Sequence, residues 1–235
     1  MGNWSGDPFT GVRPLRRLAS ITTQLFFTAS LFVLLRWQGF TEHPWVSGFV
    51  AHFFGRSLEG RYQRVIDFYG PDYGMPLETA LQLAAQIAKI DLKTSIDCGT
   101  GTGFAASLAA SHFPEARVVG VDRSRRMLED ARRTRGTQFP GIGWICADTG
   151  RLPFSTGSAD LVIAQNTMPF LREFGRVCRS GGLVIFADSS AAWVSRAARS
   201  AALRLGVFDE VVAGKAGIGF YLIARRAAAI IPREQ

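Results

Sequence analysis

Short apolar runs rich in Val and Ile alternate, from residue 77 onward, with longer stretches in which apolar residues recur at helical spacing. Short β-branched runs are typical of buried strands, and the longer stretches are typical of helices. The pattern predicts strands at residues 94–98, 117–122, 142–147, 159–164, 182–188, 208–213 and 219–224. It predicts helices at residues 77–90, 104–111, 124–135, 171–178 and 191–205.

This alternation indicates an α/β fold. Parallel neighbours in a sheet need long crossover connections, so strands separated by helices predict a mostly parallel sheet with helices on both faces. The last two runs are separated only by residues 214–218 and predict an antiparallel C-terminal hairpin. We therefore expect a seven-stranded sheet in a domain of residues 76–235. Residues 1–75, rich in Phe, Trp and Arg, would form a helical cap or a membrane-associated segment.

Composition narrows the class of protein. The chain has 235 residues, 47% of them hydrophobic, which suits one α/β domain with an appendage. Its net charge of +8 favours contact with anions such as phosphate, nucleic acid or acidic lipid. The three cysteines and three histidines lie far apart and lack metal-binding spacing, so we expect reduced thiols, a cytosolic location and no metal.

A glycine-rich turn is the strongest candidate site. The segment TSIDCGTGTGF, residues 94–104, is a predicted strand that ends at an acidic residue and enters an Ala-rich helix through Gly99, Gly101 and Gly103. Glycines let a ligand approach the backbone, and amides at the helix start can bind its polar part. About 20 residues later, a second strand ends at Asp122, where a carboxylate can hold the ribose hydroxyls of an adenosine. The third glycine of the dinucleotide fingerprint would fall on Phe104, which disfavours a nicotinamide dehydrogenase.

Four motifs in order resemble the class I methyltransferases that use S-adenosylmethionine: IDCGTGTG, VVGVDRS, WICADTGRLPFSTGSADLVIA and RVCRSGGLVIFAD. The resemblance covers residues 69–226 and is nearest to the type 11 branch, which includes the ubiquinone and menaquinone C-methyltransferases. It implies that the donor lies across the carboxyl ends of the first, second and fourth strands.

The resemblance also implies roles for individual residues. The methionine half of the donor would face Asp97, Cys98, Gly99, Thr100, Gly101 and Gly103. Asp122 would hold the ribose, and Arg123 and Met127 would flank the adenine. Asp148 would accept from the adenine amino group, with Thr149 beside it, and Ala164 and Gln165 would lie beneath the sulfonium. The chain departs from the family after the fourth strand, where Gln165 to Phe170 runs almost directly into a helix, so substrate residues expected there are in doubt.

The N-terminal segment has two interpretations. Leu18 to Leu35 is a run of 18 uncharged residues, at the lower limit of the ~20 needed to span a bilayer. The Arg residues before it would send the following chain outside the cell, away from S-adenosylmethionine. A helix in the membrane interface, involving residues 13–37, or a cap packed on the domain fits better.

We expect a hydrophobic small molecule or lipid-like acceptor, because the cap is rich in aromatic residues. Candidates for a general base are His43, Tyr69 and Tyr73, while packing roles for them stay open. The alternatives are a nucleic-acid methyltransferase, suggested by the charge, and a non-catalytic donor-binding or scaffold module. A homo-oligomer also stays open.

Overall fold

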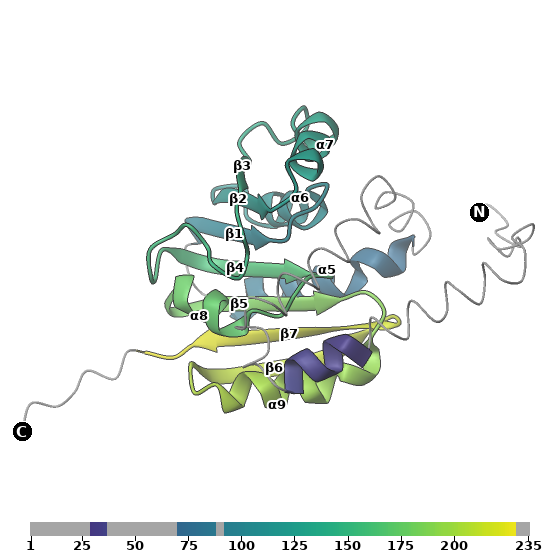
Figure 1. Cartoon of the computed structure of the whole chain (residues 1–235), viewed down its shortest axis with the longest axis vertical. Coiled ribbons are helices and arrows are strands. Elements are labelled where there is room, and N and C mark those ends of the chain that lie inside the picture. Colours follow the sequence, from purple (N-terminus) through teal and green to yellow (C-terminus); the bar gives the residue numbers. More distant parts are fainter. Residues whose placement is uncertain (1–28, 37–69, 88–91, 229–235) are drawn as a thin grey trace, which may run out of the picture.

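The computed structural model describes residues 29–36, 70–87 and 92–228. In this part of the chain, a seven-stranded sheet lies between two layers of helices (Figure 1). The strands are β1 (Thr94–Cys98), β2 (Arg117–Asp122), β3 (Gly143–Cys146), β4 (Ala159–Gln165), β5 (Cys178–Asp188), β6 (Phe208–Ala216) and β7 (Gly219–Arg226). The helices outside residues 29–36 are α5 (Pro71–Ile87), α6 (Phe104–His112), α7 (Arg125–Arg135), α8 (Leu171–Val177), the short 3₁₀ helix η1 (Ala192–Val194) and α9 (Ser195–Arg204).

The strand order is β3-β2-β1-β4-β5-β7-β6. The first five strands run parallel, and β7 is antiparallel to both of its neighbours, β5 and β6. The predicted fold class, a mostly parallel seven-stranded sheet with an antiparallel C-terminal hairpin, is therefore confirmed. The order reverses between β1 and β4, and ligands of open α/β sheets bind at such a reversal, outside the carboxyl ends of the strands.

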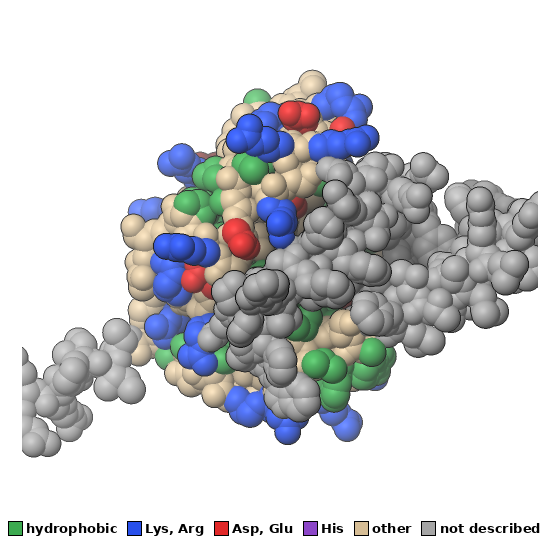
Figure 2. Space-filling view, viewed as in Figure 1, with side chains coloured by type: hydrophobic (Ala, Val, Ile, Leu, Met, Phe, Trp, Pro, Cys, Tyr) green, Lys and Arg blue, Asp and Glu red, His purple; other side chains and the backbone are tan. Residues whose placement is uncertain are grey.

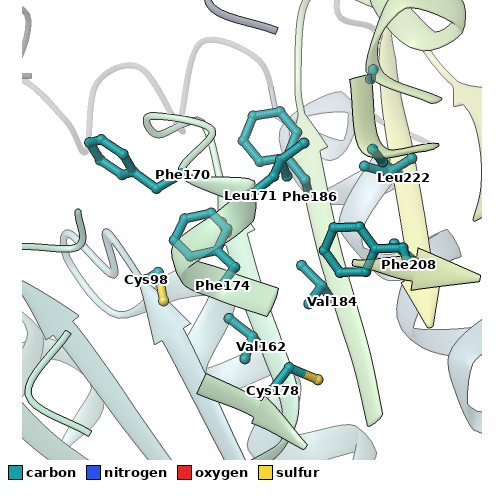
Figure 3. Close-up of a cluster of buried hydrophobic side chains, with 14 of the residues drawn as sticks. Cys98, Val162, Phe170, Leu171, Phe174, Cys178, Val184, Phe186, Phe208 and Leu222 are labelled. Atoms are coloured by element: carbon teal, nitrogen blue, oxygen red, sulfur yellow. The ribbon is translucent and has the colours of Figure 1, made fainter. Parts of the chain in front are cut away.

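Two apolar clusters fill the space on either side of the sheet. Successive side chains of a strand point to opposite faces, so Ile163 of β4 packs with α5 and α6 while Val162 packs with α8 and α9. Figure 3 shows part of the second cluster, where Phe174 of α8 lies near Cys98 and Val162. The same alternation determines which side chains at the strand ends lie on the same face of the sheet.

Residues 29–36 are helical and pack against the domain. Leu31, Leu34 and Leu35 are buried, and Leu31 and Leu35 join the cluster on the α9 face. Phe32 and Val33 are exposed, and the Phe32 ring stacks on Trp193 with centroids 5.5 Å apart. Among the residues that the structure describes, no helix combines the length and apolarity that crossing a bilayer requires. Residues 71–75 of the predicted cap belong to helix α5, and residues 1–28 and 37–69, with His43 and Tyr69, lie outside the described residues.

Several element boundaries differ from the prediction. Helix α5 begins at Pro71 rather than at Leu77. Proline suits the first helical position, and the helix then continues through Gly74 and Pro76. The predicted helix 191–205 is divided into η1 and α9. Strand β5 begins at Cys178, earlier than predicted, and α8 ends one residue before it.

Candidate functional site

The predicted site residues converge at the carboxyl ends of β1, β2 and β4. Asp97 pairs in register with Gly120 of β2 and with Ile163 of β4, two residues before Gln165. Asp122 is the last residue of β2, and Gln165 is the last residue of β4. The structure thus brings Asp97, Asp122, Gln165 and the loop between β1 and α6 to the edge where the strand order reverses.

The loop between β1 and α6 is held tightly by backbone hydrogen bonds. The amides of Gly99 and Thr100 both donate to the carbonyl of Val121, at 2.8 and 2.9 Å. Gly99, Gly101 and Gly103 have φ values of 77°, 53° and 81°, in the left-handed region that favours glycine. The glycine pattern is therefore required by the turn itself.

Asp122 is fixed against this loop. One carboxylate oxygen accepts from the amide of Gly101 at 2.9 Å, and the other accepts from the amide of Ser124 at 2.8 Å. Burial raises the pKa of Asp122, and the amides of Ser124 and Gly101 and the charge of Arg123 oppose that rise. Each carboxylate oxygen has a second lone pair, so the group keeps acceptor capacity for a ligand hydroxyl.

Three glycines near the site, two of them in the loop, also make room for protein side chains. A Cβ on Gly103 would lie 2.6 Å from the Trp144 ring, and one on Gly120 would lie 2.8 Å from the same ring. A Cβ on Gly99 would lie 2.8 Å from the Cβ of Thr167. We expected ligand approach to be the reason for glycine in the loop; at Gly103 the indole of Trp144 is a second reason.

Buried acceptors without partners gather near the loop. Neither oxygen of Asp97 has a hydrogen-bond partner of normal geometry, although the side chain is fully buried. The Thr100 and Thr102 hydroxyls and Oε1 of Gln165 are likewise buried and unpaired. Orphaned buried groups are costly and call for a specific explanation.

Burial raises the pKa of Asp97 from its ordinary 3.8 to about 7. The Thr100 side chain and the backbone of Ala106 oppose the rise, and the charge of Asp122 adds to it. Strand alternation places Asp97 and Gln165 on the same face of the sheet, since Ile96, Cys98 and Ala164 belong to the opposite cluster. A cationic or N–H-bearing ligand group would satisfy both side chains.

The remaining predicted site residues occupy different surroundings. The Cys98 thiol is buried in the α8-side cluster (Figure 3), and burial raises its pKa, so only its backbone can face the loop side.

The residues predicted to contact the adenine differ in exposure. Met127 is 8% exposed and follows the N-cap Ser124, whereas Arg123 is exposed. Asp148 is exposed, and its Oδ1 accepts from the Gly150 amide at 2.9 Å. Thr149 follows it. Ala164 is fully buried on the α8 side.

Sequence reasoning missed a hydrogen-bonded network beside Gln165. The carbonyl of Tyr73 accepts from Nε2 of Gln165 at 2.8 Å and from the hydroxyl of Ser189 at 2.7 Å. The Tyr73 ring is 1% exposed and contacts Phe104 edge-on. Tyr73 therefore joins the site through its backbone. Serine after a strand carries no motif by which this network could have been found.

Sequence reasoning also missed how the segment after β3 is anchored. Glu173 of α8 accepts from the amide of Leu152 at 2.7 Å, and Arg176 donates to the carbonyls of Leu152 and Phe154 at 3.1 and 2.9 Å. The two side chains also pair with each other at 2.7 Å. An acid and a base three residues apart on a predicted helix is a signal that could have suggested the ion pair.

This strand order and glycine loop define a class I, Rossmann-like methyltransferase fold. Residues 96–182 match the family model of the methyltransferase domain. The matched residues therefore resemble the methyltransferase domain, and the proteins of this class use S-adenosylmethionine as the methyl donor. The unpaired acceptors, the loop amides and Asp122 fit the ammonium, carboxylate and ribose of that molecule.

Curated relatives match the same region. A malonyl-[acyl-carrier protein] O-methyltransferase of Legionella pneumophila is 34% identical over 110 residues, which are 43% of this chain and 38% of the relative. A ubiquinone/menaquinone biosynthesis C-methyltransferase of Desulfotalea psychrophila is 33% identical over 102 residues, 40% of this chain and 41% of the relative. A trans-aconitate 2-methyltransferase of an Azoarcus strain is 36% identical over 92 residues, 39% of this chain and 34% of the relative. The chain spans about two fifths of the length of these relatives or less.

Solved structures share the fold. A SAM-dependent methyltransferase from Aquifex aeolicus aligns with a TM-score of 0.53 and 17% identity, covering 70% of this chain and 98% of that one. The [4+2]-cyclase SpnF aligns with a TM-score of 0.52 and 14% identity, covering 65% and 81%. These likenesses concern the fold alone, and a cyclase among them shows that the fold also carries other reactions.

Proposed function

We propose that this chain is a methyltransferase that transfers a methyl group in line from S-adenosylmethionine to a hydrophobic small-molecule or lipid-like acceptor. The observation that carries the donor half of this proposal is the set of buried, unpaired acceptors beside the glycine loop. A folded protein retains such groups at a cost, and a cationic ligand would offset that cost.

We propose specific roles for the residues of the donor site. Asp97 and Gln165 accept from the ammonium of the donor, and the amides at the start of α6 bind its carboxylate. Asp122 holds the ribose hydroxyls, while Arg123 and Met127 flank the adenine and Asp148 accepts from its amino group. Thr149 and Ala164 stay predictions as contacts of the donor.

When bound, S-adenosylmethionine supplies a methyl group on a positively charged sulfur. The residues of the chain have to align the acceptor with that methyl group and exclude water, which are the main requirements of an in-line displacement. A base is needed only for a weak nucleophile. Tyr73 is buried at the site, so its backbone role is the better supported; His43 and Tyr69 stay predictions as bases.

Exposed apolar side chains beside the site support a hydrophobic acceptor. Trp193, 55% exposed, follows β5 and stacks on Phe32. Ile218, 49% exposed, lies at the turn into β7, and its carbonyl accepts from Ala192 at 3.0 Å. Both turns belong to the same edge of the sheet as Gln165, because β7 begins opposite the end of β5. Figure 2 shows hydrophobic side chains gathered where residues 29–36 lie in Figure 1.

Replacing Asp122 with Ala is expected to weaken S-adenosylhomocysteine binding by roughly 1 to 3 kcal/mol, because hydrogen bonds to the ribose are lost. Titration calorimetry measures this change. Asp209→Ala, at an exposed position of β6, is the matched control and should bind as the wild type does. Equal affinity of the Asp122 variant and the wild type would contradict the donor site.

Replacing Trp193 with Ala is expected to raise KM for a hydrophobic acceptor by about 5- to 150-fold, since an aromatic surface of this size contributes about 1 to 3 kcal/mol when a ligand covers it. Donor affinity should stay unchanged. Steady-state formation of S-adenosylhomocysteine with acceptors of increasing chain length measures the effect. Leu203→Ala, near the far end of α9, is the control, and the same KM change there would argue against an acceptor surface at Trp193.

The net positive charge of the chain supports a second candidate function, nucleic-acid methylation. Arg132 and Arg133 of α7 are exposed, but Arg133 pairs with Asp130 and Arg132 bonds the Trp144 carbonyl. These contacts favour a solvated helix face. A gel shift with duplex DNA and with RNA at low salt tests the alternative, and salt-sensitive binding would support it. A non-catalytic donor-binding module would bind S-adenosylhomocysteine and methylate no acceptor class.

We also propose that the protein is cytosolic and that its N-terminal residues 13–37 contact the membrane surface. Leu31, Leu34 and Leu35 are buried in the domain, so within residues 29–36 only the exposed face with Phe32 and Val33 is free for such contact. Flotation of the full chain with anionic liposomes tests the proposal. Recovery of all the protein away from the lipid fraction would contradict it.

A further inference from the structure

Ser189 joins three elements at the same edge of the sheet as Gln165. It directly follows β5 and is 2% exposed. Its hydroxyl donates to the carbonyl of Tyr73 in α5 at 2.7 Å and accepts from Nδ2 of Asn166 at 2.9 Å. Its amide donates to Oδ1 of Asn166 at 2.8 Å. A single small side chain thus ties the first turn of α5 to the ends of β4 and β5.

The same network fixes the orientation of the Gln165 side-chain amide. Nε2 of Gln165 donates to the Tyr73 carbonyl at 2.8 Å and to the Ser189 hydroxyl at 3.3 Å. A flipped amide would place Oε1 against the lone pairs of the Tyr73 carbonyl, which offers no donor. Oε1 therefore points away from these partners, and it is buried and unpaired.

Asn166 adopts a backbone conformation that depends on Ser189. Its φ is 51°, in the left-handed region, and it is the non-glycine residue with positive φ in the described part of the chain. Asparagine tolerates this region better than most residues, and the two hydrogen bonds between its side chain and Ser189, one donated and one accepted, hold it there. The end of β4, which carries Gln165, is thus fixed by the residue that follows β5.

We propose that Ser189 is a positioning residue for the donor site. It holds the Gln165 amide so that Oε1, together with Asp97, accepts from the ammonium of the amino-acid part of S-adenosylmethionine. This inference rests on the proposed function. Asp97 and Gln165 lie on the same face of neighbouring strands, and the Asp97 carboxylate oxygens and Oε1 of Gln165 lack partners, so a group with several N–H donors fits between them.

The test compares two ligands that differ only at the part in question. S-adenosylhomocysteine carries the amino-acid group, and 5′-methylthioadenosine lacks it. In calorimetry, Ser189→Ala is expected to lose about tenfold in affinity for S-adenosylhomocysteine and less than about twofold for 5′-methylthioadenosine. Gln165→Met should show the same selective loss, and Ser189→Thr, which keeps the hydroxyl, should recover most of it.

Ser190→Ala is the matched control. The Ser190 hydroxyl bonds Asp188 at 3.2 Å, outside the network, so the ratio of the two affinities should stay at the wild-type value. Equal weakening of both ligands in Ser189→Ala would mean that Ser189 only supports the fold, and it would overturn the inference. If Ser189→Ala does not fold, Gln165→Met tests the ammonium contact that Ser189 is proposed to position, and a wild-type ratio of the two affinities in that variant would overturn the inference. A wild-type protein that binds neither ligand would overturn the proposed function and this inference together.

Discussion

Replacing Asp97 with Asn is expected to stabilise the ligand-free protein at pH 8 and to weaken donor binding. Burial raises the pKa of Asp97 to about 7 in the folded protein, against 3.8 for an exposed aspartate. Between these values the folded state holds a proton that the unfolded state has released, so the free energy of unfolding falls as pH rises. The fall ends above about pH 7, where both states are ionised.

The size of this effect follows from the pKa difference. A change from 3.8 to about 7 corresponds to roughly 4 kcal/mol across the whole range. The asparagine side chain carries no charge to desolvate, so the variant should gain a few kcal/mol over the wild type at pH 8 and much less at pH 5. Urea unfolding at the two pH values measures the gain. A variant less stable than the wild type at pH 8 would contradict the assignment of an unpaired buried carboxylate.

Donor binding should change in the opposite direction. The ammonium of the donor favours ionised Asp97, so wild-type affinity for S-adenosylhomocysteine should rise as pH increases through about 7. The Asp97→Asn variant should bind more weakly at pH 8 and should lose most of this pH dependence. Wild-type affinity that falls over the same range would contradict an ammonium partner for Asp97.

Replacing Gly103 with Ala is expected to cost about 3 kcal/mol of stability, for two reasons that can be separated. The φ of 81° disfavours an L-residue by about 1 to 2 kcal/mol. The added Cβ would also lie 2.6 Å from the Trp144 ring, and such overpacking costs about 1 to 3 kcal/mol. Chemical denaturation of the variant measures the sum.

Gly206→Ala is the matched control for backbone strain alone. Gly206 has a φ of 65°, and a Cβ there would meet nothing within 4 Å. This variant should lose only about 1 kcal/mol. Equal losses in the two variants would show that Trp144 does not set the requirement for glycine at residue 103.

Most of the fold could be predicted from the sequence, because the local hydrophobic pattern and the tertiary packing of this chain favour the same elements. The β-branched runs of β1, β2 and β4 are buried on both faces, so their apolar stretches are nearly continuous and easily recognised. Helix α5 begins six residues before the predicted start, and these residues include Gly74 and Pro76, which have low helix propensity. Packing of Leu77 and Leu81 against the sheet outweighs that preference.

The candidate site was only partly visible in the sequence. Asp97, the glycines and Asp122 stand at strand ends, where position alone indicates a role. Ser189 and Trp144 act through contacts across 24 and 41 residues of chain, respectively, to Gln165 and Gly103. Pairings of this kind follow from strand order and register, which a single sequence does not reveal.

A crystal structure with S-adenosylhomocysteine tests the central claim most directly. We expect the amino-acid group of the ligand at the loop of residues 99–103, with its ammonium within hydrogen-bonding distance of Asp97 and Gln165 and its ribose hydroxyls on Asp122. A ligand bound elsewhere on the domain, with Asp97 still buried and unpaired, would contradict the claim.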